Sequence, residues 1–134
     1  MANTNMSTTV ECNHCKHRFQ INGQTIVSER QCRGNDGKLI YITYFDCPKC
    51  KERYYVQVDD QESIVQKNKC LVSFRSLAKL KIAKKKISKQ QQDRFNKYRE
   101  VLKDMRFELM KQYNETDVTD TITGEEMFVK FTVL

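Results

Sequence analysis

The chain has 134 residues, a hydrophobic fraction of 39% and a formal net charge of +7. This length fits one domain, or a small domain with an appendage, and the low apolar content leaves little material for a large core. No run approaches the roughly 18 apolar residues that a membrane span requires, and the polar first ten residues do not resemble a signal segment. We therefore expect a cytoplasmic protein that does not enter a membrane.

The charge is unevenly distributed along the chain. Residues 1–59 carry 8 basic and 6 acidic side chains, residues 60–113 carry 15 and 6, and residues 114–134 carry 1 and 5. We expect these stretches to be a cysteine-containing β region, a basic helical region and an acidic strand segment. The basic region includes a dense lysine run, made of Lys79, Lys81, Lys84, Lys85, Lys86 and Lys89. Such a run attracts a polyanion or an acidic protein face, and we predict that it binds the partner.

Four of the six cysteines form two Cys-x-x-Cys pairs, Cys12 with Cys15 and Cys47 with Cys50. A Cys-x-x-Cys turn places two thiolates on one side of a tight loop. Two such turns that face each other give the tetrahedron of sulfur atoms that Zn²⁺ accepts. We predict that these four residues bind one structural Zn²⁺.

The two histidines and the other two cysteines leave alternatives open. His17 lies two residues after the first pair, so a Cys₃His site is the alternative to four cysteines. Otherwise His14 and His17 are solvent-facing loop residues. Cys32 and Cys70 stand apart from the pairs, and lone cysteines are most often small buried hydrophobes. We do not expect a second metal site from them.

The residues around the cysteine pairs predict β structure. We expect a strand around residues 25–29, a hairpin turn at the Gly-Asn-Asp-Gly sequence of residues 34–37, and a strand over 39–45, which is dense in β-branched and aromatic residues. Residues 54–58 supply a third strand. The prediction is a three-stranded antiparallel sheet with the metal at one end and Phe19 covering one side of the site.

Residues 60–113 contain no glycine or proline, and their apolar residues recur every three or four positions, which indicates helix. One apolar face is expected at Ile64, Leu71, Phe74 and Ala78, and a second at Phe95, Tyr98, Leu102, Met105 and Leu109. The sequence from Ser88 to Gln91 has the form of a capping box. We therefore favour two helices in a hairpin, with one long helix as the alternative.

The acidic C-terminal segment predicts a turn and a strand. Residues 123–125 look like a turn, and an alternating pattern follows in which one side is formed by Met127, Val129, Phe131 and Val133. A single strand needs a partner, and we expect an edge of the ribbon sheet to provide it. The fold class expected for the whole chain is α+β.

Catalytic patterns are missing from the sequence. It has no glycine-rich phosphate loop and no serine-centred elbow, and four thiolates would leave zinc no open position for hydrolysis. The adjacent carboxylates Asp59 and Asp60, like Glu125 and Glu126, are typical of solvated turns. We predict a binding protein and not an enzyme.

Electron transfer is also disfavoured. The sequence Cys-Pro-Lys-Cys at 47–50 resembles the second iron knuckle of rubredoxins. However, Lys16 and Lys51 stand where that resemblance implies glycine, and the chain has no tryptophan. A thioredoxin-like dithiol is unlike this arrangement too, because such a motif opens a helix, whereas Cys50 runs into a predicted strand.

Residues 10–58 resemble a zinc ribbon whose two knuckles are Cys-Asn-His-Cys and Cys-Pro-Lys-Cys. In its small size, its Lys/Asn/Gln/Tyr-rich composition and its bare ribbon with a helical appendage, the chain is similar to proteins of phages and mobile elements of low-GC Gram-positive bacteria. These include inhibitors of type II CRISPR effector nucleases (anti-CRISPR proteins). The resemblance implies a stoichiometric blocker that binds the effector and prevents guide or target loading, with structural zinc and no turnover.

Two partner classes follow. An interaction protein would occupy a surface of a large protein or nucleoprotein with its basic face. A DNA- or RNA-binding protein would use the lysine run for phosphates and four tyrosines for base stacking, namely Tyr41, Tyr44, Tyr54 and Tyr55. A cluster made only of lysine suits nonspecific attraction, since base reading usually uses arginine, asparagine or glutamine. The apolar strip over 95–109 is compatible with packing inside one chain or with a dimer seam.

Overall fold

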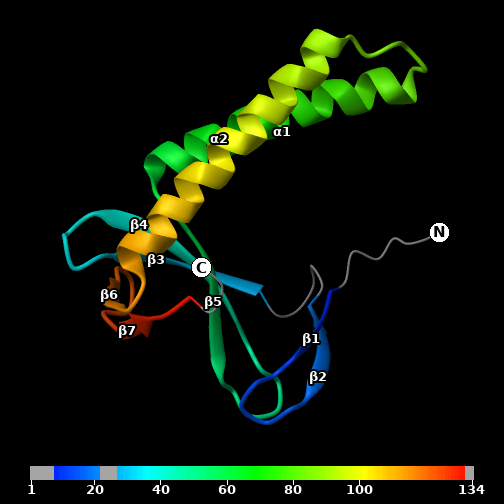
Figure 1. The fold of residues 1–134 in the computed structure, drawn as a ribbon. Coiled ribbons are helices and arrows are strands. Elements are labelled where there is room, and N and C mark those ends of the chain that lie inside the picture. Colours follow the sequence, from blue (N-terminus) through cyan, green and yellow to red (C-terminus); the bar gives the residue numbers. More distant parts are fainter. Residues whose placement is uncertain (1–7, 22–26, 132–134) are drawn as a thin grey trace. The chain divides into compact units, whose positions relative to one another are not determined.

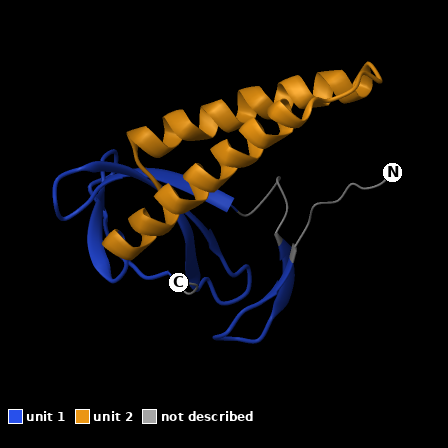
Figure 2. Cartoon of the chain, turned by 45° about the horizontal axis from the view of Figure 1, so that its top comes forward, with its two compact units in different colours: residues 1–58, 113–134 blue, residues 59–112 orange. Residues whose placement is uncertain are grey.

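The computed structural model describes residues 8–21 and 27–131. In order along the chain, the elements in these ranges are β1 (Thr8–Glu11), β2 (Arg18–Ile21), β3 (Val27–Arg33), β4 (Leu39–Asp46), β5 (Arg53–Asp59), α1 (Gln61–Ile82), α2 (Lys89–Tyr113), β6 (Thr116–Asp120) and β7 (Glu126–Val129) (Figure 1). The chain forms two compact units (Figure 2). Residues 1–58 and 113–134 make up the β unit, and residues 59–112 make up the helical unit. The α+β class is confirmed.

Strands β1 and β2 form a two-stranded antiparallel sheet of their own. In its register Val10 lies opposite Phe19, and Glu11 opposite Arg18. The sequence did not suggest these strands, because each has only four residues and the turn between them carries a cysteine pair in place of a glycine-rich hairpin signal.

The main sheet has five strands in the order β5-β4-β3-β6-β7. The predicted hairpin turn joins β3 to β4, and the N–H of Gly37, which has φ +82°, donates to the Gly34 carbonyl at 2.9 Å. The three strands expected for the ribbon are present as neighbours. Strand β3 begins at Val27 and extends to Arg33, further than the predicted strand, of which residues 25 and 26 lie outside the described residues.

The C-terminal segment completes this sheet, as predicted, but with two strands. Strand β6 pairs with β3, and β7 pairs with β6. The predicted alternation holds in β7 and beyond, because Met127, Val129 and Phe131 are buried while Phe128 is 57% exposed. Val133 lies outside the described residues. An isolated parallel bridge links Phe131, two residues beyond the end of β7, to Tyr55 of β5.

The core of the β unit includes the last residue of α2. Tyr113 is fully buried, and its hydroxyl donates to Asp36 Oδ2 at 2.9 Å. Its ring lies so close to Gly34 that a Cβ at that position would overlap Tyr113 Cε1. Gly34 is thus required by close packing. The fully buried apolar side chains of the β unit also include Ile40, Ile42, Val58, Val118 and Val129.

In the helical unit, hydrogen-bonded caps define where both helices begin. Asp60 caps α1, since its Oδ1 accepts from the Ser63 N–H at 2.8 Å and the Ser63 Oγ accepts from the Asp60 N–H at 2.9 Å. The capping box predicted for α2 is confirmed, because the Gln91 N–H donates to Ser88 Oγ and the Ser88 N–H donates to Gln91 Oε1, both at 3.1 Å. The hairpin is therefore correct and the single long helix is wrong.

Helix α1 ends in a Schellman motif. The N–H of Lys84 donates to the Lys81 carbonyl at 3.1 Å, and the N–H of Lys85 donates to the Leu80 carbonyl at 2.9 Å. Lys84 has φ +57°, a left-handed conformation that glycine usually supplies. The chain thus leaves α1 sharply without a glycine.

The two helices differ in how well their apolar faces were predicted. The face predicted for α2 is confirmed, since Leu109 is buried and the other four residues are half-buried. In α1 the prediction is wrong at Leu71 and Phe74, which are 38% and 55% exposed. The buried positions are Ser63, Gln66, Cys70 and Leu77. Because these side chains are mostly polar or small, an apolar pattern in the sequence does not reveal the buried face of α1.

In the described chain, neither helix is long and apolar enough to cross a membrane.

Candidate metal centre

The first cysteine pair lies in the tight turn between β1 and β2. The N–H of Lys16 donates to the Cys12 carbonyl at 2.8 Å, and the N–H of Cys12 donates to the His17 carbonyl at 2.9 Å. The N–H of Cys15 points at Cys12 Sγ, 3.5 Å away. Lys16 is left-handed, with φ +66°. These bonds hold both thiols of the pair on the inside of one turn.

The second pair lies between β4 and β5 and repeats this geometry. The N–H of Lys51 donates to the Cys47 carbonyl at 2.9 Å, and the N–H of Cys47 donates to the Glu52 carbonyl at 2.8 Å. Lys51 also has φ +66°. A non-glycine residue in the left-handed conformation costs about 1 kcal/mol. Lys16 and Lys51 both have this conformation, so each turn contains one strained residue directly after its second cysteine.

A sequence repeat underlies the two turns. Residues 12–19 and 47–54 share the pattern Cys-x-x-Cys-Lys-x-Arg followed by an aromatic residue, which is Phe19 in the first copy and Tyr54 in the second. This repeat is the sequence signal from which Tyr54, like Phe19, could have been predicted to be part of the site.

The four thiols come together at one point in the β unit. All four Sγ atoms lie within 4.8 Å of one another, with 3.5 Å between Cys12 and Cys50 and 3.6 Å between Cys15 and Cys47. A tetrahedral ion with Zn–S bonds of about 2.3 Å places its sulfur ligands about 3.8 Å apart, whereas a disulfide needs about 2.05 Å. The spacing fits a metal ion, and all four cysteines are free. The cluster can therefore hold a metal ion.

Neither histidine belongs to this cluster. The group of potential ligands found in the described ranges contains the four cysteines and no histidine. His14 is exposed, and the ring of His17 stacks on Phe19 with a centroid distance of 6.0 Å. The structure thus favours the four-cysteine set over a Cys₃His set. Cys32 and Cys70 are not part of the cluster and are buried, as expected for small hydrophobes, and burial raises the pKa of Cys32 to about 11.

Aromatic rings cover the cluster on one side. Phe19 and Phe45 are buried together with Cys12 and Cys47, and Tyr54 packs against them. Phe45 meets Phe19 edge-on at 5.9 Å and stacks on Tyr54 at 5.4 Å. The predicted cover by Phe19 is confirmed, and the two cysteines packed with these rings, Cys12 and Cys47, are 1% and 0% exposed.

The hydroxyl of Tyr54 contacts the cluster directly. It lies 3.1 Å from Cys12 Sγ and accepts a hydrogen bond from the Asn13 N–H at 3.0 Å, which leaves its own proton for the sulfur. Burial raises the pKa of Cys12, but the Tyr54 hydroxyl and the N–H groups of Cys15 and His14 outweigh it and lower that pKa to about 6. The Tyr54 hydroxyl thus stabilises the thiolate form of Cys12.

The thiols of Cys12, Cys47 and Cys50 differ in the direction of their pKa shifts. The N–H of Glu52 lowers the pKa of Cys50, but burial and the three neighbouring sulfur atoms outweigh it and raise that pKa to about 12. The pKa of Cys47 is lowered, because hydrogen bonds from the N–H groups of Cys50 and Lys49 outweigh its burial. A metal ion held by four thiolates must therefore displace protons from the cluster.

The lysine run lies at the end of the helical hairpin. Lys79 and Lys81 are in the last turn of α1, residues 84–86 are in the connecting loop, and Lys89 begins α2. The run is therefore not one basic helix face but a tip, which we call the lysine tip (Lys79, Lys81, Lys84, Lys85, Lys86 and Lys89). All six side chains are exposed, and none of them forms an ion pair with another described residue.

The tyrosines considered for base stacking are largely engaged within the β unit. Tyr44 is buried, its hydroxyl accepts from Arg30 Nε at 2.8 Å, and the guanidinium of Arg53 lies 4.1 Å from its ring centroid. Tyr55 packs against Tyr44 at 6.0 Å, and Tyr54 is committed to Cys12. These rings serve packing and the sulfur cluster.

The adjacent carboxylates Asp59 and Asp60 have separate structural partners. Asp59 is buried and forms an ion pair with Arg106, whose Nε and Nη2 lie 2.8 and 3.2 Å from its two carboxylate oxygens. It also accepts from Ser63 Oγ at 2.8 Å. Asp60 caps α1.

Comparison of the chain with models of known protein families, with curated proteins and with solved structures finds no match. The zinc-ribbon resemblance of residues 10–58 therefore rests on the four-cysteine cluster.

Proposed function

We propose that the protein is a non-catalytic binding protein whose β unit is stabilised by one zinc ion. The convergence of four cysteine Sγ atoms within 4.8 Å, on two turns of the same geometry, supports this proposal. Tetrahedral sulfur sites favour zinc or iron–sulfur chemistry, and four protein ligands on zinc leave no position for a substrate. The role of the ion is then structural.

Replacing one of the four cysteines tests whether the cluster binds zinc. Structural zinc in small domains contributes on the order of 10 kcal/mol, most of it as folding free energy. Cys47→Ser should lose the zinc and unfold the β unit, as measured by metal content and circular dichroism. Cys70→Ser is the matched control, because Cys70 is also buried but lies outside the cluster, and it should keep one zinc per chain. Full zinc content and an unchanged Tm in Cys47→Ser would contradict the proposal.

The lysine tip is the surface proposed to meet the partner. Its six exposed lysines lack intramolecular ion pairs among the described residues, so their potential is available to an acidic protein face or to phosphates. The resemblance to phage-encoded inhibitors makes a nucleic-acid-guided effector nuclease the first partner to test. In that proposal the tip occupies a surface that normally meets nucleic acid, and it blocks loading of guide or target.

Direct binding of DNA or RNA is the second candidate, and the all-lysine composition of the tip favours it. Lysine contacts phosphates as a point charge, so binding would be nonspecific and would weaken steeply with salt. The engagement of Tyr44 and Tyr54 argues against a base-stacking platform on the sheet.

Capture from a bacterial lysate separates the two candidates. The tagged, zinc-loaded protein should retain a protein partner after nuclease treatment if it is an interaction protein. Recovery of DNA or RNA that is lost with nuclease, with no protein left, would establish the second candidate instead.

Two charge-reversal variants then test whether the lysine tip contacts the partner. The variant carrying Lys84→Glu, Lys85→Glu and Lys86→Glu should lose the partner while remaining folded. The matched control reverses three exposed helical lysines away from the tip, Lys67, Lys97 and Lys103, and should keep it. Equal retention by both variants at physiological salt would show that the tip is not the contact.

A further inference from the structure

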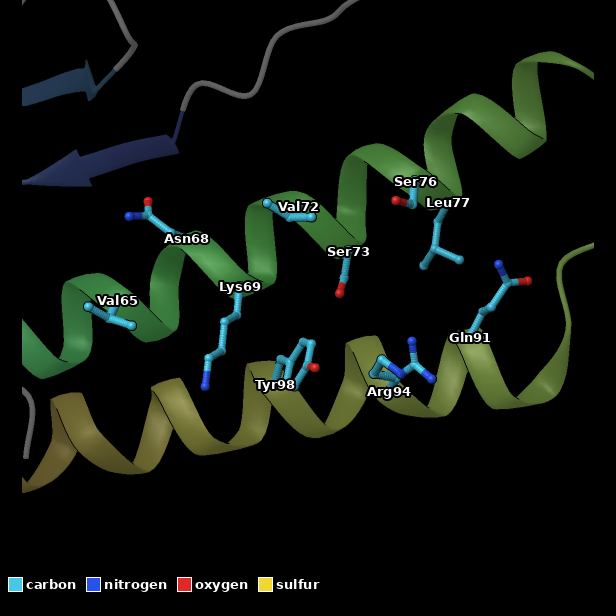
Figure 3. A pocket seen from close by; sticks show the side chains of 10 residues that line it. All are labelled: Val65, Asn68, Lys69, Val72, Ser73, Ser76, Leu77, Gln91, Arg94 and Tyr98. Carbon is cyan, nitrogen blue, oxygen red and sulfur yellow. The ribbon is translucent and has the colours of Figure 1, made fainter.

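The helical unit contains a groove between α1 and α2 with a volume of about 530 Å³ (Figure 3). Its lining comes from both helices and consists of Val65, Asn68, Lys69, Val72, Ser73, Ser76, Leu77, Gln91, Arg94 and Tyr98. The positions on α1 span 65–77, which corresponds to about 18 Å of helix at a rise of about 1.5 Å per residue. The groove is thus as long as roughly three helical turns.

Apolar side chains form one part of the lining. Val65 and Val72 are 50% and 61% exposed, although valine is most often buried, and the buried Leu77 contributes to the lining nearer Gln91 (Figure 3). The two valines are seven residues apart and therefore lie on one side of α1. The ring of Tyr98 contributes further apolar surface from α2.

The charged side chains that line the groove are all positive. Lys69 of α1 and Arg94 of α2 both line the groove, and its lining includes no carboxylate. In Figure 3 the Lys69 side chain extends from α1 toward α2, on the side where Tyr98 lies. Neither cation forms an ion pair within the described chain. The groove therefore combines exposed apolar surface with two available positive charges.

The two helices are tied to each other, so the walls of the groove are defined. The buried side chain of Gln66 donates to the Tyr98 carbonyl at 3.0 Å. Further along, the rings of Phe74 and Phe95 lie 6.0 Å apart. These two contacts come from both halves of α1.

We propose that this groove binds an acidic amphipathic segment of the partner, with its apolar side chains on Val65, Val72 and Leu77 and its carboxylates on Lys69 and Arg94. The inference rests on the proposed function, in that the partner is a protein. A guanidinium binds a carboxylate with two parallel hydrogen bonds, and an amphipathic helix in an apolar groove is a common mode of peptide recognition.

The same lining argues against other occupants. A phosphate backbone would gain nothing from the valines, although both cations would attract it. A second copy that placed the same groove across a two-fold axis would set Lys69 and Arg94 against like charges, which weakens association.

A peptide titration tests the groove with defined probes. The full-length, zinc-loaded, ¹⁵N-labelled protein is titrated to about 1 mM with a synthetic peptide of about 18 residues, long enough to fill the groove, that has leucines at helical spacing and glutamates elsewhere. The control peptides replace every glutamate by lysine or every leucine by serine. We expect saturable shifts of the amide signals of Ser73, Ser76 and Gln91 with the first peptide only.

Variants make this test specific. Arg94→Glu should weaken binding of the acidic peptide at least about tenfold, because a carboxylate contact becomes a repulsion. Lys97→Glu changes the charge of α2 equally but lies outside the lining, and it should bind as the unmodified protein does.

Several outcomes would overturn the inference. These are equal shifts with the lysine peptide, shifts confined to residues 84–86, no shifts at all, or groove shifts that appear without peptide as the protein concentration rises, which would identify a second copy as the occupant. Failure of the groove inference can be told apart from failure of the proposed function. If Arg94→Glu keeps the captured partner while reversal of Lys84, Lys85 and Lys86 loses it, the groove inference fails and the proposed function stands.

Discussion

Removing the hydroxyl of Tyr54 perturbs the metal centre without touching a ligand. In the structure this oxygen lies 3.1 Å from Cys12 Sγ and 3.0 Å from the Asn13 nitrogen. In Tyr54→Phe the ring still stacks on Phe45, so the aromatic cover is preserved while the hydrogen bond to the sulfur is lost. The exposed Asn13 N–H can bond to water instead.

The size of the effect follows from the charge on the sulfur. A hydrogen bond to an ionised group contributes about 1.5 to 3 kcal/mol, and loss of a group that supports a metal ligand typically costs about 10- to 100-fold in metal affinity. These two ranges agree, since a tenfold change is about 1.4 kcal/mol. We expect Tyr54→Phe to weaken zinc binding by about 10- to 100-fold while the fold of the loaded protein is unchanged.

The assay is competition for zinc with a chromophoric chelator at fixed pH, together with circular dichroism of the loaded protein. Tyr41→Phe is the matched control, because it removes a hydroxyl from a half-buried tyrosine of the same unit that does not contact the cluster. A zinc affinity of Tyr54→Phe within about twofold of the control would refute the reasoning, because a lost hydrogen bond to a thiolate should cost more.

Three further predictions concern stability, measured by denaturant unfolding of the zinc-loaded protein. Arg106→Ala should lower the free energy of unfolding by about 3 kcal/mol, because it removes the ion pair that Arg106 forms with the buried carboxylate of Asp59. Gly34→Ala should cost about 2 kcal/mol, because the new Cβ overlaps the ring of Tyr113. Lys84→Gly should stabilise by up to about 1 kcal/mol, since glycine adopts the left-handed conformation of this position without strain.

Each of these has its own control. Lys103→Ala removes an exposed cation from the same helix as Arg106 and should change the free energy of unfolding by less than about 0.5 kcal/mol. In a Tyr113→Leu background the cost of Gly34→Ala should shrink, and an unchanged cost would mean that the ring is not the obstacle. Lys86→Gly, in the same loop but without a positive φ, should not stabilise. A gain equal to that of Lys84→Gly would attribute the effect to loop flexibility.

The features that the sequence predicted correctly depend on neighbours in the chain. The two Cys-x-x-Cys turns, the Gly-Asn-Asp-Gly hairpin and the capping box of Ser88 each need only a few residues in a row, so their residue types specify them directly. The regular apolar spacing of α2 belongs to the same class, since a helix face repeats every three or four residues. The meeting of the four cysteines was predictable because metal chemistry restricts both the type and the spacing of candidate ligands.

Tertiary structure decided which of these local pieces meet. The sulfur atoms of Cys12 and Cys50 are 38 positions apart in sequence, and their 3.5 Å separation depends on two hairpins from different sheets. The buried face of α1 carries Gln66, whose burial is tolerated because the Tyr98 carbonyl accepts its hydrogen bond. The contact between Tyr54 and Cys12 likewise joins residues that are far apart in the sequence. Because such contacts depend on a distant partner, the type of one residue alone does not predict them.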